Sequence, residues 1–166
     1  AEMQKFRDKY LPADLTGVRV LDVGAMDLNG CYRAIFKDAD YLGLDQEPGQ
    51  NVDLIANDEY GDWEIDDDSF DVVISGQCLE HAEHPDDLVE EMYRVVKPGG
   101  LVCCIAPWQW VEHKHPIDCW RILPDGMRVL FRVGYREAMP GEEPLGLEVL
   151  ECYMSEWDTV GIGRKK

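Results

Sequence analysis

The sequence predicts an α/β domain built on a doubly wound, mostly parallel β-sheet, and three observations lead to this fold class. Short apolar runs alternate with stretches of helical periodicity along the chain. One apolar run leads directly into a glycine turn at Gly24. Residues 101–106 are almost wholly apolar, which is typical of a parallel strand buried on both faces. With 166 residues, the chain is expected to form one domain over residues 1–166.

The first half of the chain supplies two expected helices and four strands. Met3, Phe6 and Tyr10 share one face of a short opening helix. Asn29 can cap a second helix with apolar residues over 32–36. The four strands are expected at residues 18–23, 41–44, 52–56 and 70–75.

The connection between the second and third strands is unusually short, because only residues 46–51 separate them. Parallel neighbours normally need a crossover of about a dozen residues. Either this crossover is reduced to a loop, or one of the two strands is shorter than its apolar run.

The second half supplies two further helices and three strands, for about seven strands in all. Pro85 lies in the first turn of a helix, where Asp86 and Asp87 favour the positive end of the helix dipole. Pro98 stops this helix after Lys97. The other elements are a strand at 101–106, a helix at 124–131 and an antiparallel pair of closing strands at 148–157 and 159–163.

Composition and charge exclude several classes of function. The chain has 34 Asp and Glu against 16 Lys and Arg, for a formal net charge of −18. A surface this negative repels nucleic acids and anionic membranes. No apolar run approaches the ~20 residues of a membrane helix, and no signal peptide is expected. The six cysteines form no CxxC pair, so reduced thiols and a cytoplasmic location are expected.

A glycine turn and an acidic strand end together indicate a nucleoside-containing ligand. The backbone at Gly24 can approach a ligand closely. Asp45 ends the second strand, where its carboxylate can accept hydrogen bonds from both hydroxyls of a ribose. The dinucleotide fingerprint GxGxxG is broken at Met26 and Asn29.

Five motifs, taken together, narrow the prediction to one protein family. In order they are VLDVG at 20–24, Asp45, SFDVVIS at 69–75, LEH at 79–81 and VVKPGGL at 95–101. As a set they resemble the class I S-adenosylmethionine-dependent methyltransferases, and most closely the small type 11, UbiE-like group. The resemblance runs over residues 18–131 and implies a Rossmann-like fold with S-adenosyl-L-methionine as cofactor. One departure is Met26, which stands where most of the family has a second glycine.

Two further segments narrow the resemblance within the group. NGCYR at 29–33 and HPIDCWRILPDG at 115–126 are similar to segments of bacterial proteins often associated with sugar or cell-surface polysaccharide pathways. This similarity suggests a class of pathway but does not identify the substrate.

The resemblance also implies which residues hold the cofactor. They are Asp22, Gly24, Ala25 and Met26 for the methionine portion, Asp45 and Gln46 for the ribose, Asp58 and Glu59 near the adenine, and Ser75, Gly76 and Gln77 beside the transferring methyl group.

Methyl transfer to a protonated acceptor atom also needs a base, and the loop after the fifth strand carries candidates. His113 and His115 lie there among several tryptophans. Asp118 could orient a histidine, or pair with Arg121 and have no catalytic part. These ligand types could also bind a metal, but a loop does not readily fix three ligands, so no metal site is expected.

The loop after the fourth strand carries a third histidine. His81 is a further base candidate, although the pair Glu80-His81 could instead tie this loop to the sheet. The tryptophans Trp108, Trp110 and Trp120 could form an aromatic wall for a flat acceptor, or fold their loop onto the sheet.

The sequence therefore predicts methyl transfer to oxygen or nitrogen of a small-molecule acceptor, such as a sugar or another metabolite. One alternative is a non-catalytic module that binds the cofactor or supports a partner. Another is a methyltransferase that acts on a protein. No nucleic acid or membrane partner is expected, and the closing strand pair leaves a homodimer open.

Overall fold

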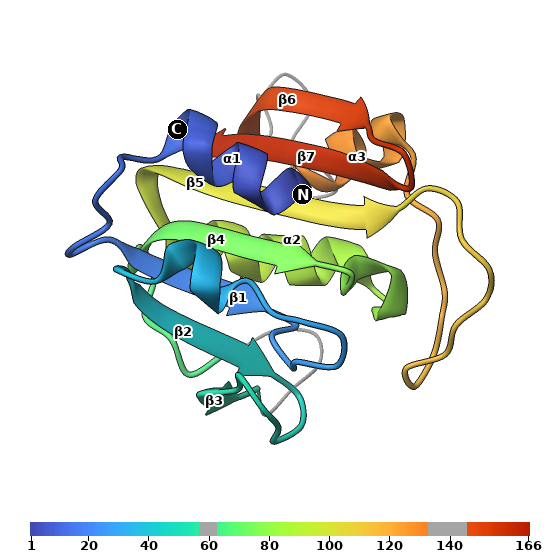
Figure 1. Ribbon diagram of the computed structural model, residues 1–166. Coiled ribbons are helices and arrows are strands. Elements are labelled where there is room, and N and C mark those ends of the chain that lie inside the picture. The colour runs from blue at the N-terminus through green and yellow to red at the C-terminus, as the bar shows by residue number, and fades with distance from the viewer. Residues whose placement is uncertain (57–62, 133–145) are drawn as a thin grey trace.

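The computed structural model of the chain describes residues 1–56, 63–132 and 146–166. A seven-stranded sheet forms its centre, in the order β3-β2-β1-β4-β5-β7-β6 (Figure 1). The strands are β1 (Arg19–Val23), β2 (Asp40–Asp45), β3 (Leu54–Ile55), β4 (Phe70–Gly76), β5 (Val96–Pro107), β6 (Leu147–Met154) and β7 (Asp158–Lys165). Strands β1 to β5 pair in parallel, whereas β7 runs antiparallel to β5 and β6. The expected Rossmann-like α/β fold with an antiparallel closing pair is confirmed.

Helices cover both faces of the sheet, and each face buries its own apolar cluster (Figure 1). Successive strand residues point to opposite faces: Val20 packs with α1 (Glu2–Tyr10) and the short 3-10 helix η1 (Arg33–Phe36). Leu21 packs on the other face with α2 (Pro85–Val95) and α3 (Pro124–Leu130). Because both faces are covered, the central strands are apolar without alternation, as their sequences predict.

Two elements of the first half are shorter than the sequence predicts. The helix expected from Asn29 is only the turn η1, and Gly30 N donates instead to Asp27 Oδ1 at 2.7 Å. The strand expected at 52–56 is reduced to β3, and a loop replaces the crossover helix. The short connection left two alternatives open, a crossover reduced to a loop and a shortened strand, and the structure shows both.

The close approach of this loop to β2 explains how so short a connection works. A Cβ atom at Gly43 would lie 2.0 Å from the carbonyl oxygen of Asn51, so only glycine lets the loop pass directly over the strand. Arg33 of η1 then holds the loop, since its Nε donates to Asn51 Oδ1 at 2.6 Å and its Nη2 pairs with Asp53. The guanidinium group thus does part of the packing that a crossover helix would do.

The carboxyl ends of the parallel strands meet at one edge of the sheet. There β1 ends at Val23, β2 at Asp45, β4 at Gly76 and β5 at Pro107, which pairs with Asp158 at the start of β7. The 3-10 helix η2 (Leu79–His81) follows β4 at the same edge. In the part of the chain that the structure describes, no helix has the length and apolar character needed to cross a membrane.

Candidate active site

The turn after β1 brings the backbone to the edge of the sheet. Gly24 has a φ of +77°, and its N–H and that of Ala25 both donate to Leu44 O at 3.0 Å. A Cβ atom at Gly24 would lie 2.6 Å from both Cβ and Sγ of Cys78. The turn therefore requires glycine twice, once for its backbone conformation and once for the space.

Asp45 at the end of β2 is half-buried and fixed by backbone donors. Its Oδ2 accepts from Met26 N at 2.9 Å, and its Oδ1 accepts from Gln46 N at 2.8 Å. Oδ1 also accepts a long hydrogen bond from Glu47 N at 3.5 Å. A carboxylate has about four acceptor positions, so Oδ2 in particular keeps one for a ligand hydroxyl. The arrangement suits the ribose of a nucleoside, whereas the side chain of Gln46 is exposed.

Asp22 lies beneath the same turn and is only 2% exposed. Its Oδ2 accepts a hydrogen bond from the hydroxyl of Tyr41, while its Oδ1 has no partner. Burial raises the pKa of Asp22 to about 7. An unpartnered carboxylate oxygen in a buried place is suited to a cationic group such as an ammonium.

The end of β4 contributes in three different ways. Ser75 is buried and its hydroxyl donates to Val23 O at 3.0 Å, so it is used within the sheet. Gly76 leaves space for a tyrosine, because a Cβ atom there would lie 2.2 Å from the hydroxyl oxygen of Tyr32. Gln77 turns outward with a φ of +60°, and its Nε2 donates to Asp158 Oδ1 at 2.9 Å. Asp58 and Glu59, expected near the adenine, lie outside the described residues.

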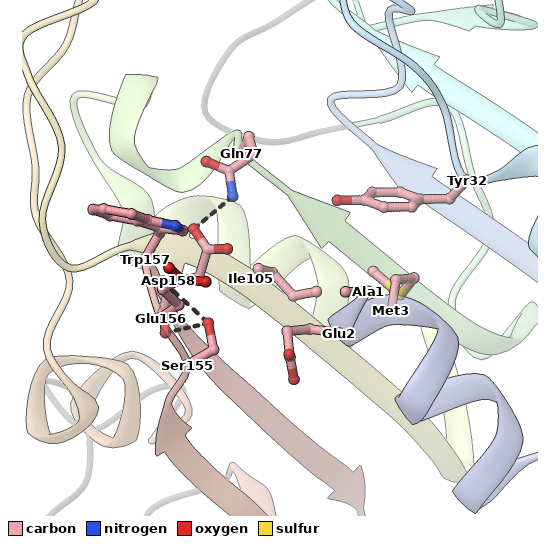
Figure 2. A pocket seen from close by; sticks show the side chains of 10 residues that line it. All are labelled: Ala1, Glu2, Met3, Tyr32, Gln77, Ile105, Ser155, Glu156, Trp157 and Asp158. Atoms are coloured by element: carbon pink, nitrogen blue, oxygen red, sulfur yellow. Dashed lines mark hydrogen bonds between the residues drawn. The ribbon is translucent and has the colours of Figure 1, made fainter.

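A cavity of about 190 Å³ opens beside this strand end, between α1, β5 and the turn from β6 to β7. Figure 2 shows Tyr32 pointing into it from one side and Gln77 with Asp158 from the other. Glu2 and Glu156 add two more carboxylates to its lining. The cavity is therefore small and acidic.

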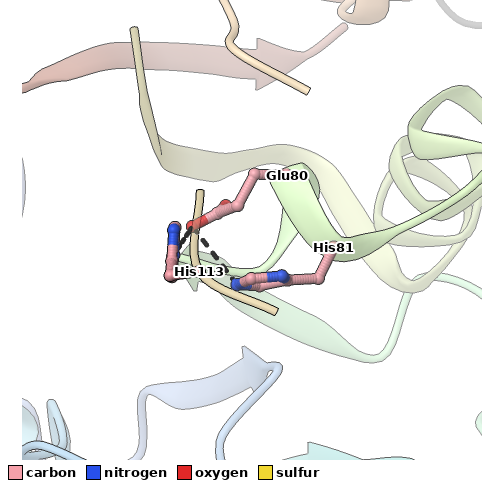
Figure 3. Close-up of side chains that lie close together, drawn as sticks. All are labelled: Glu80, His81 and His113. Atoms are coloured by element: carbon pink, nitrogen blue, oxygen red, sulfur yellow. Dashed lines mark ion pairs between the residues drawn. The ribbon is translucent and has the colours of Figure 1, made fainter. Parts of the chain in front are cut away.

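The histidine cluster, defined here as Glu80, His81 and His113, joins the turn after β4 to the loop after β5 (Figure 3). Nε2 of His81 lies 3.7 Å from Glu80 Oε1, and Nε2 of His113 lies 4.0 Å from it. The two imidazole rings meet edge to face at 5.0 Å between centroids. Glu80 has no exposed surface, and neither carboxylate oxygen has a hydrogen-bond partner. Burial raises its pKa to about 7.

The other predicted catalytic residues divide around this cluster. Asp118 contacts His113 twice, accepting from its N–H at 2.7 Å and lying 3.3 Å from its Nδ1. It also pairs with both Nη atoms of Arg121, and these hydrogen bonds hold the pKa of Asp118 well below its usual range. Asp118 therefore makes both contacts that were expected of it, one with a histidine and one with Arg121. His115 is exposed and lies outside the cluster.

The backbone of Glu80 ties the two loops, since its carbonyl oxygen accepts from Cys119 N at 2.7 Å and from Trp120 N at 3.2 Å. The expected tie joined this loop to the sheet, whereas the tie observed joins it to the loop after β5 and uses the backbone of Glu80. The side chain of Glu80 takes no part in it. Nδ1 of His81 adds to it with a contact of 2.5 Å to Ile117 O.

The tryptophans also divide between the two expected roles. Trp108 donates to Ser155 O at 3.1 Å and Trp120 to Ala82 O at 2.8 Å, so both fold the loop onto the domain. Trp110 is 52% exposed and meets Trp157 edge to face at 5.4 Å, beside Val111. This exposed pair forms a shallow apolar hollow that could stack on an acceptor.

Sequence reasoning missed several of the residues that meet at this edge. Tyr32 and Asp158 were expected only as parts of a helix and of a turn, and Trp157 as the end of a strand. Glu80 was considered only as a structural tie, although a glutamate that follows an apolar strand and packs under the sheet edge is a signal for a buried functional carboxylate. No local pattern predicts that Asp158 meets Gln77.

Comparison with known proteins places the chain in a family. The sequence model of the methyltransferase domain matches residues 21–104, which is half of the chain. An uncharacterized methyltransferase of Mycobacterium avium is 28% identical over 153 residues, covering 84% of this chain and 59% of that protein. A ubiquinone biosynthesis O-methyltransferase of Maricaulis maris is 31% identical over 93 residues, covering 56% of this chain and 34% of that protein. The chain thus spans less than two thirds of the length of these relatives.

Solved structures agree on the fold. An S-adenosylmethionine-dependent methyltransferase of Mesorhizobium loti superposes with a TM-score of 0.67 at 15% identity, covering 99% of this chain and 98% of that chain. A Haloferax volcanii putative methyltransferase, solved with its activator Trm112, has a TM-score of 0.67 at 21% identity, covering 97% and 88%. The chain therefore belongs to the methyltransferase-domain family, as a class I, UbiE-like domain of the kind whose cofactor is S-adenosylmethionine.

Proposed function

We propose that the chain transfers the methyl group of S-adenosylmethionine to an oxygen or nitrogen atom of a small-molecule acceptor. One observation carries this proposal: residues suited to the cofactor and residues suited to an acceptor meet at one edge of the sheet. Asp22 and Asp45 lie at the ends of β1 and β2, and the cavity between Tyr32 and Asp158 lies past the end of β4. Ligands of open α/β sheets bind at this edge.

The charges of the first region fit the cofactor. When bound, the cofactor supplies an electrophilic methyl group on a sulfonium cation, and its amino-acid tail carries an ammonium. The unpartnered oxygen of Asp22 offers that tail a buried acceptor, and Asp45 offers acceptors to the ribose hydroxyls. Opposite charges in a partly desolvated site attract more strongly than in water.

The second region supports a small acceptor. The cavity of about 190 Å³ has room for a metabolite-sized group, and the Trp110–Trp157 pair offers an apolar face nearby. The net charge of −18 disfavours a nucleic acid. A sugar ring or a similar flat metabolite suits both surfaces.

The acceptor atom must lose its proton as it bonds to the methyl carbon, and the histidine cluster is the candidate to assist. His113 is oriented through its Nδ1 by Asp118, and His81 through its Nδ1 by Ile117 O. Each ring therefore turns its Nε2 toward Glu80. Asp118 is engaged by Arg121, which makes it a positioning residue, and the exposed His115 has no part in this arrangement.

The experiment that tests this function uses the purified chain with methyl-labelled S-adenosylmethionine and a fractionated cell extract. Label is expected in the small-molecule fraction, and an Asp45→Asn variant should lose most of the incorporation because it holds the ribose less well. Label in the protein fraction instead would establish a protein acceptor. Cofactor binding by calorimetry with no label in any fraction would favour a non-catalytic module and overturn the proposal.

A further inference from the structure

The carboxylate of Glu80 is buried, and none of the residues assigned to methyl transfer gives it a hydrogen-bond partner. Its side chain has no exposed surface, and neither carboxylate oxygen has a hydrogen-bond partner in another residue. A buried ionised carboxylate without a partner costs several kcal/mol of stability, so such groups are normally paired, bound to a metal or neutralised by a proton. The nearest candidates are two histidine nitrogens at 3.7 and 4.0 Å, too far for hydrogen bonds (Figure 3).

The hydrogen bonds of the two rings show which nitrogen faces Glu80 as a lone pair. Nδ1 of His81 lies 2.5 Å from Ile117 O, and Nδ1 of His113 lies 3.2 Å from Val111 O and 3.3 Å from Asp118 Oδ2. Carbonyl and carboxylate oxygens only accept, so we assign the proton of each neutral ring to Nδ1. Nε2 of each ring then carries a lone pair directed at the same carboxylate.

We propose that Glu80, His81 and His113 bind a divalent transition-metal ion, with Zn²⁺ as the best match. Two imidazole nitrogens and one carboxylate oxygen are a ligand set that zinc uses in catalytic sites, where a fourth position stays open. Metal-bound histidines almost always donate their other N–H to a carbonyl or carboxylate, which is what Ile117 O and Asp118 provide here.

The distances are close to those of a formed site. Ligands about 2.0–2.1 Å from a tetrahedral ion lie about 3.4 Å from one another. The two distances to Glu80 Oε1 are 3.7 and 4.0 Å, and all three ligand atoms lie within 4.8 Å of one another. His113 is part of the loop after β5 and is only half-buried, so it can move the remaining distance.

The charges around the cluster also favour a cation. The guanidinium of Arg121 is engaged by both oxygens of Asp118 and offsets the charge of Glu80 only in part. Asp118 and Asp158 both add negative potential at Glu80. A divalent ion would balance this charge and give Glu80 the partner that it lacks.

The ion would also have a role in catalysis. This role rests on the proposed function, whereas the binding site itself does not. Three protein ligands would leave one coordination position of the ion open for an oxygen of the acceptor. A hydroxyl of the acceptor bound there would release its proton to solvent more readily, because a bound divalent ion lowers the pKa of oxygen ligands. The cluster would then activate the acceptor without a free imidazole base.

Calorimetric titration of the chelator-treated, full chain with ZnCl2, without donor or acceptor, tests the site. We expect one ion per chain. Glu80→Gln and His113→Ala should each weaken binding by more than tenfold, beyond the about 10-fold that even outer-shell changes cost. His115→Ala is the matched control, because it removes an exposed histidine from the same loop and should leave binding unchanged.

A second measurement uses Co²⁺, whose visible spectrum reports its ligands. A tetrahedral nitrogen and oxygen spectrum that is lost in Glu80→Gln supports the site. A thiolate charge-transfer band would place the ion on a cysteine, such as the exposed Cys119, and would overturn the proposal. Retained binding in folded Glu80→Gln and His113→Ala, or no binding by the wild type, would do the same. If His113→Ala does not fold, His113→Gln and the Co²⁺ spectrum of the wild type decide.

The two proposals fail separately. A chain that binds one Zn²⁺ but methylates nothing contradicts only the proposed function. A chain that methylates its acceptor unchanged by chelator, and binds no Zn²⁺, contradicts only the metal site.

Discussion

The two halves of the candidate site are built in different ways. In the first, around Asp22, Gly24 and Asp45, adjacent strands hold two of the three groups through the backbone: Gly24 N donates to Leu44 O, and Asp45 accepts from Met26 N. The third, Asp22, accepts from the hydroxyl of Tyr41 on the neighbouring strand β2. In the second, the histidine cluster, side chains from η2 and from the loop after β5 meet across more than thirty residues of sequence. The first half is thus part of the sheet, whereas the second is an assembly of loops.

The halves nevertheless share one property. Each contains a buried carboxylate with an unpartnered oxygen, Asp22 in the first and Glu80 in the second. Burial raises the pKa of both to about 7. A folded domain that keeps two such groups at one edge is prepared to receive positive charge there. We propose the ammonium of the cofactor as the partner of the first group and a metal ion as the partner of the second.

The largest expected effect breaks the backbone-held half. Gly24→Ala adds a Cβ atom 2.6 Å from Cys78 at a φ of +77°, so strain and overlap together should cost about 2–5 kcal/mol of unfolding free energy. Gly17→Ala is the matched control, since Gly17 has a φ of +82° but nothing within 4 Å of an added Cβ. It should cost only about 1 kcal/mol. Urea denaturation measures both, and equal losses would show that the contact with Cys78 does not constrain the turn.

The next effect is a dependence of stability on pH through Asp22. Its folded-state pKa of about 7 lies above its ordinary 3.8, so the folded chain keeps a proton that the unfolded chain has lost. The stability from this proton is complete below the ordinary pKa and is lost as the pH rises through 7. The Asp22→Asn variant has no such proton to lose. Its unfolding free energy should therefore rise relative to that of the wild type between pH 4 and 8, on the order of 1.4 kcal/mol for each unit by which the folded-state pKa of Asp22 exceeds its ordinary value.

Urea denaturation at a series of pH values tests this expectation, and parallel curves for wild type and Asp22→Asn would contradict it. Tyr41→Phe sharpens the test. The hydroxyl of Tyr41 donates to Asp22 and lowers its pKa, so removing that donor should move the loss of stability to higher pH.

The contrast between the halves also explains what the sequence could predict. The glycine turn, Asp45 and the order of the motifs are local patterns on strands, and the structure places them at one edge as expected. The closing antiparallel pair was likewise visible, because a short turn separates two apolar runs. A shortened strand was one of the two alternatives that the short connection left open, whereas the reduction of the helix over 32–36 to the turn η1 was not predicted. Periodicity alone does not show the contacts of Arg33 with Asn51 and Asp53 that hold this part of the chain.

The histidine cluster could not be predicted from the sequence, because its members come from two separate loops. His113, His115 and Asp118 are close in the chain, so they were expected to act together, and no metal site was expected there. The structure turns His115 to solvent and brings Glu80 and His81 to His113 instead. That meeting depends on the backbone tie from Glu80 O to Cys119 and Trp120, which no local pattern encodes.

A third prediction concerns cofactor affinity at the backbone-held half. Asp45 accepts on both oxygens, whereas the amide of an Asp45→Asn variant has one acceptor and would set its NH2 against a backbone N–H. We expect S-adenosylmethionine to bind about 10–100-fold more weakly by calorimetry, as the loss of hydrogen bonds to a charged group implies. Glu47→Gln changes the charge of an exposed neighbour and serves as the control. Equal weakening in both variants would mean that Asp45 acts only through its charge.

The smallest expected effects come from two tryptophans of the loop after β5, one of which should affect acceptor binding and the other stability. Trp110 is half-exposed against Trp157, whereas Trp120 donates to Ala82 O at 2.8 Å. Trp110→Ala should raise the KM for the acceptor by about 2–10-fold through lost stacking and leave the Tm unchanged. Trp120→Phe should lower the unfolding free energy by about 1 kcal/mol through the lost hydrogen bond. A Trp110→Ala variant that loses stability but keeps its KM would assign that ring to the fold, and would leave the acceptor to be held by the cavity beside Tyr32 alone.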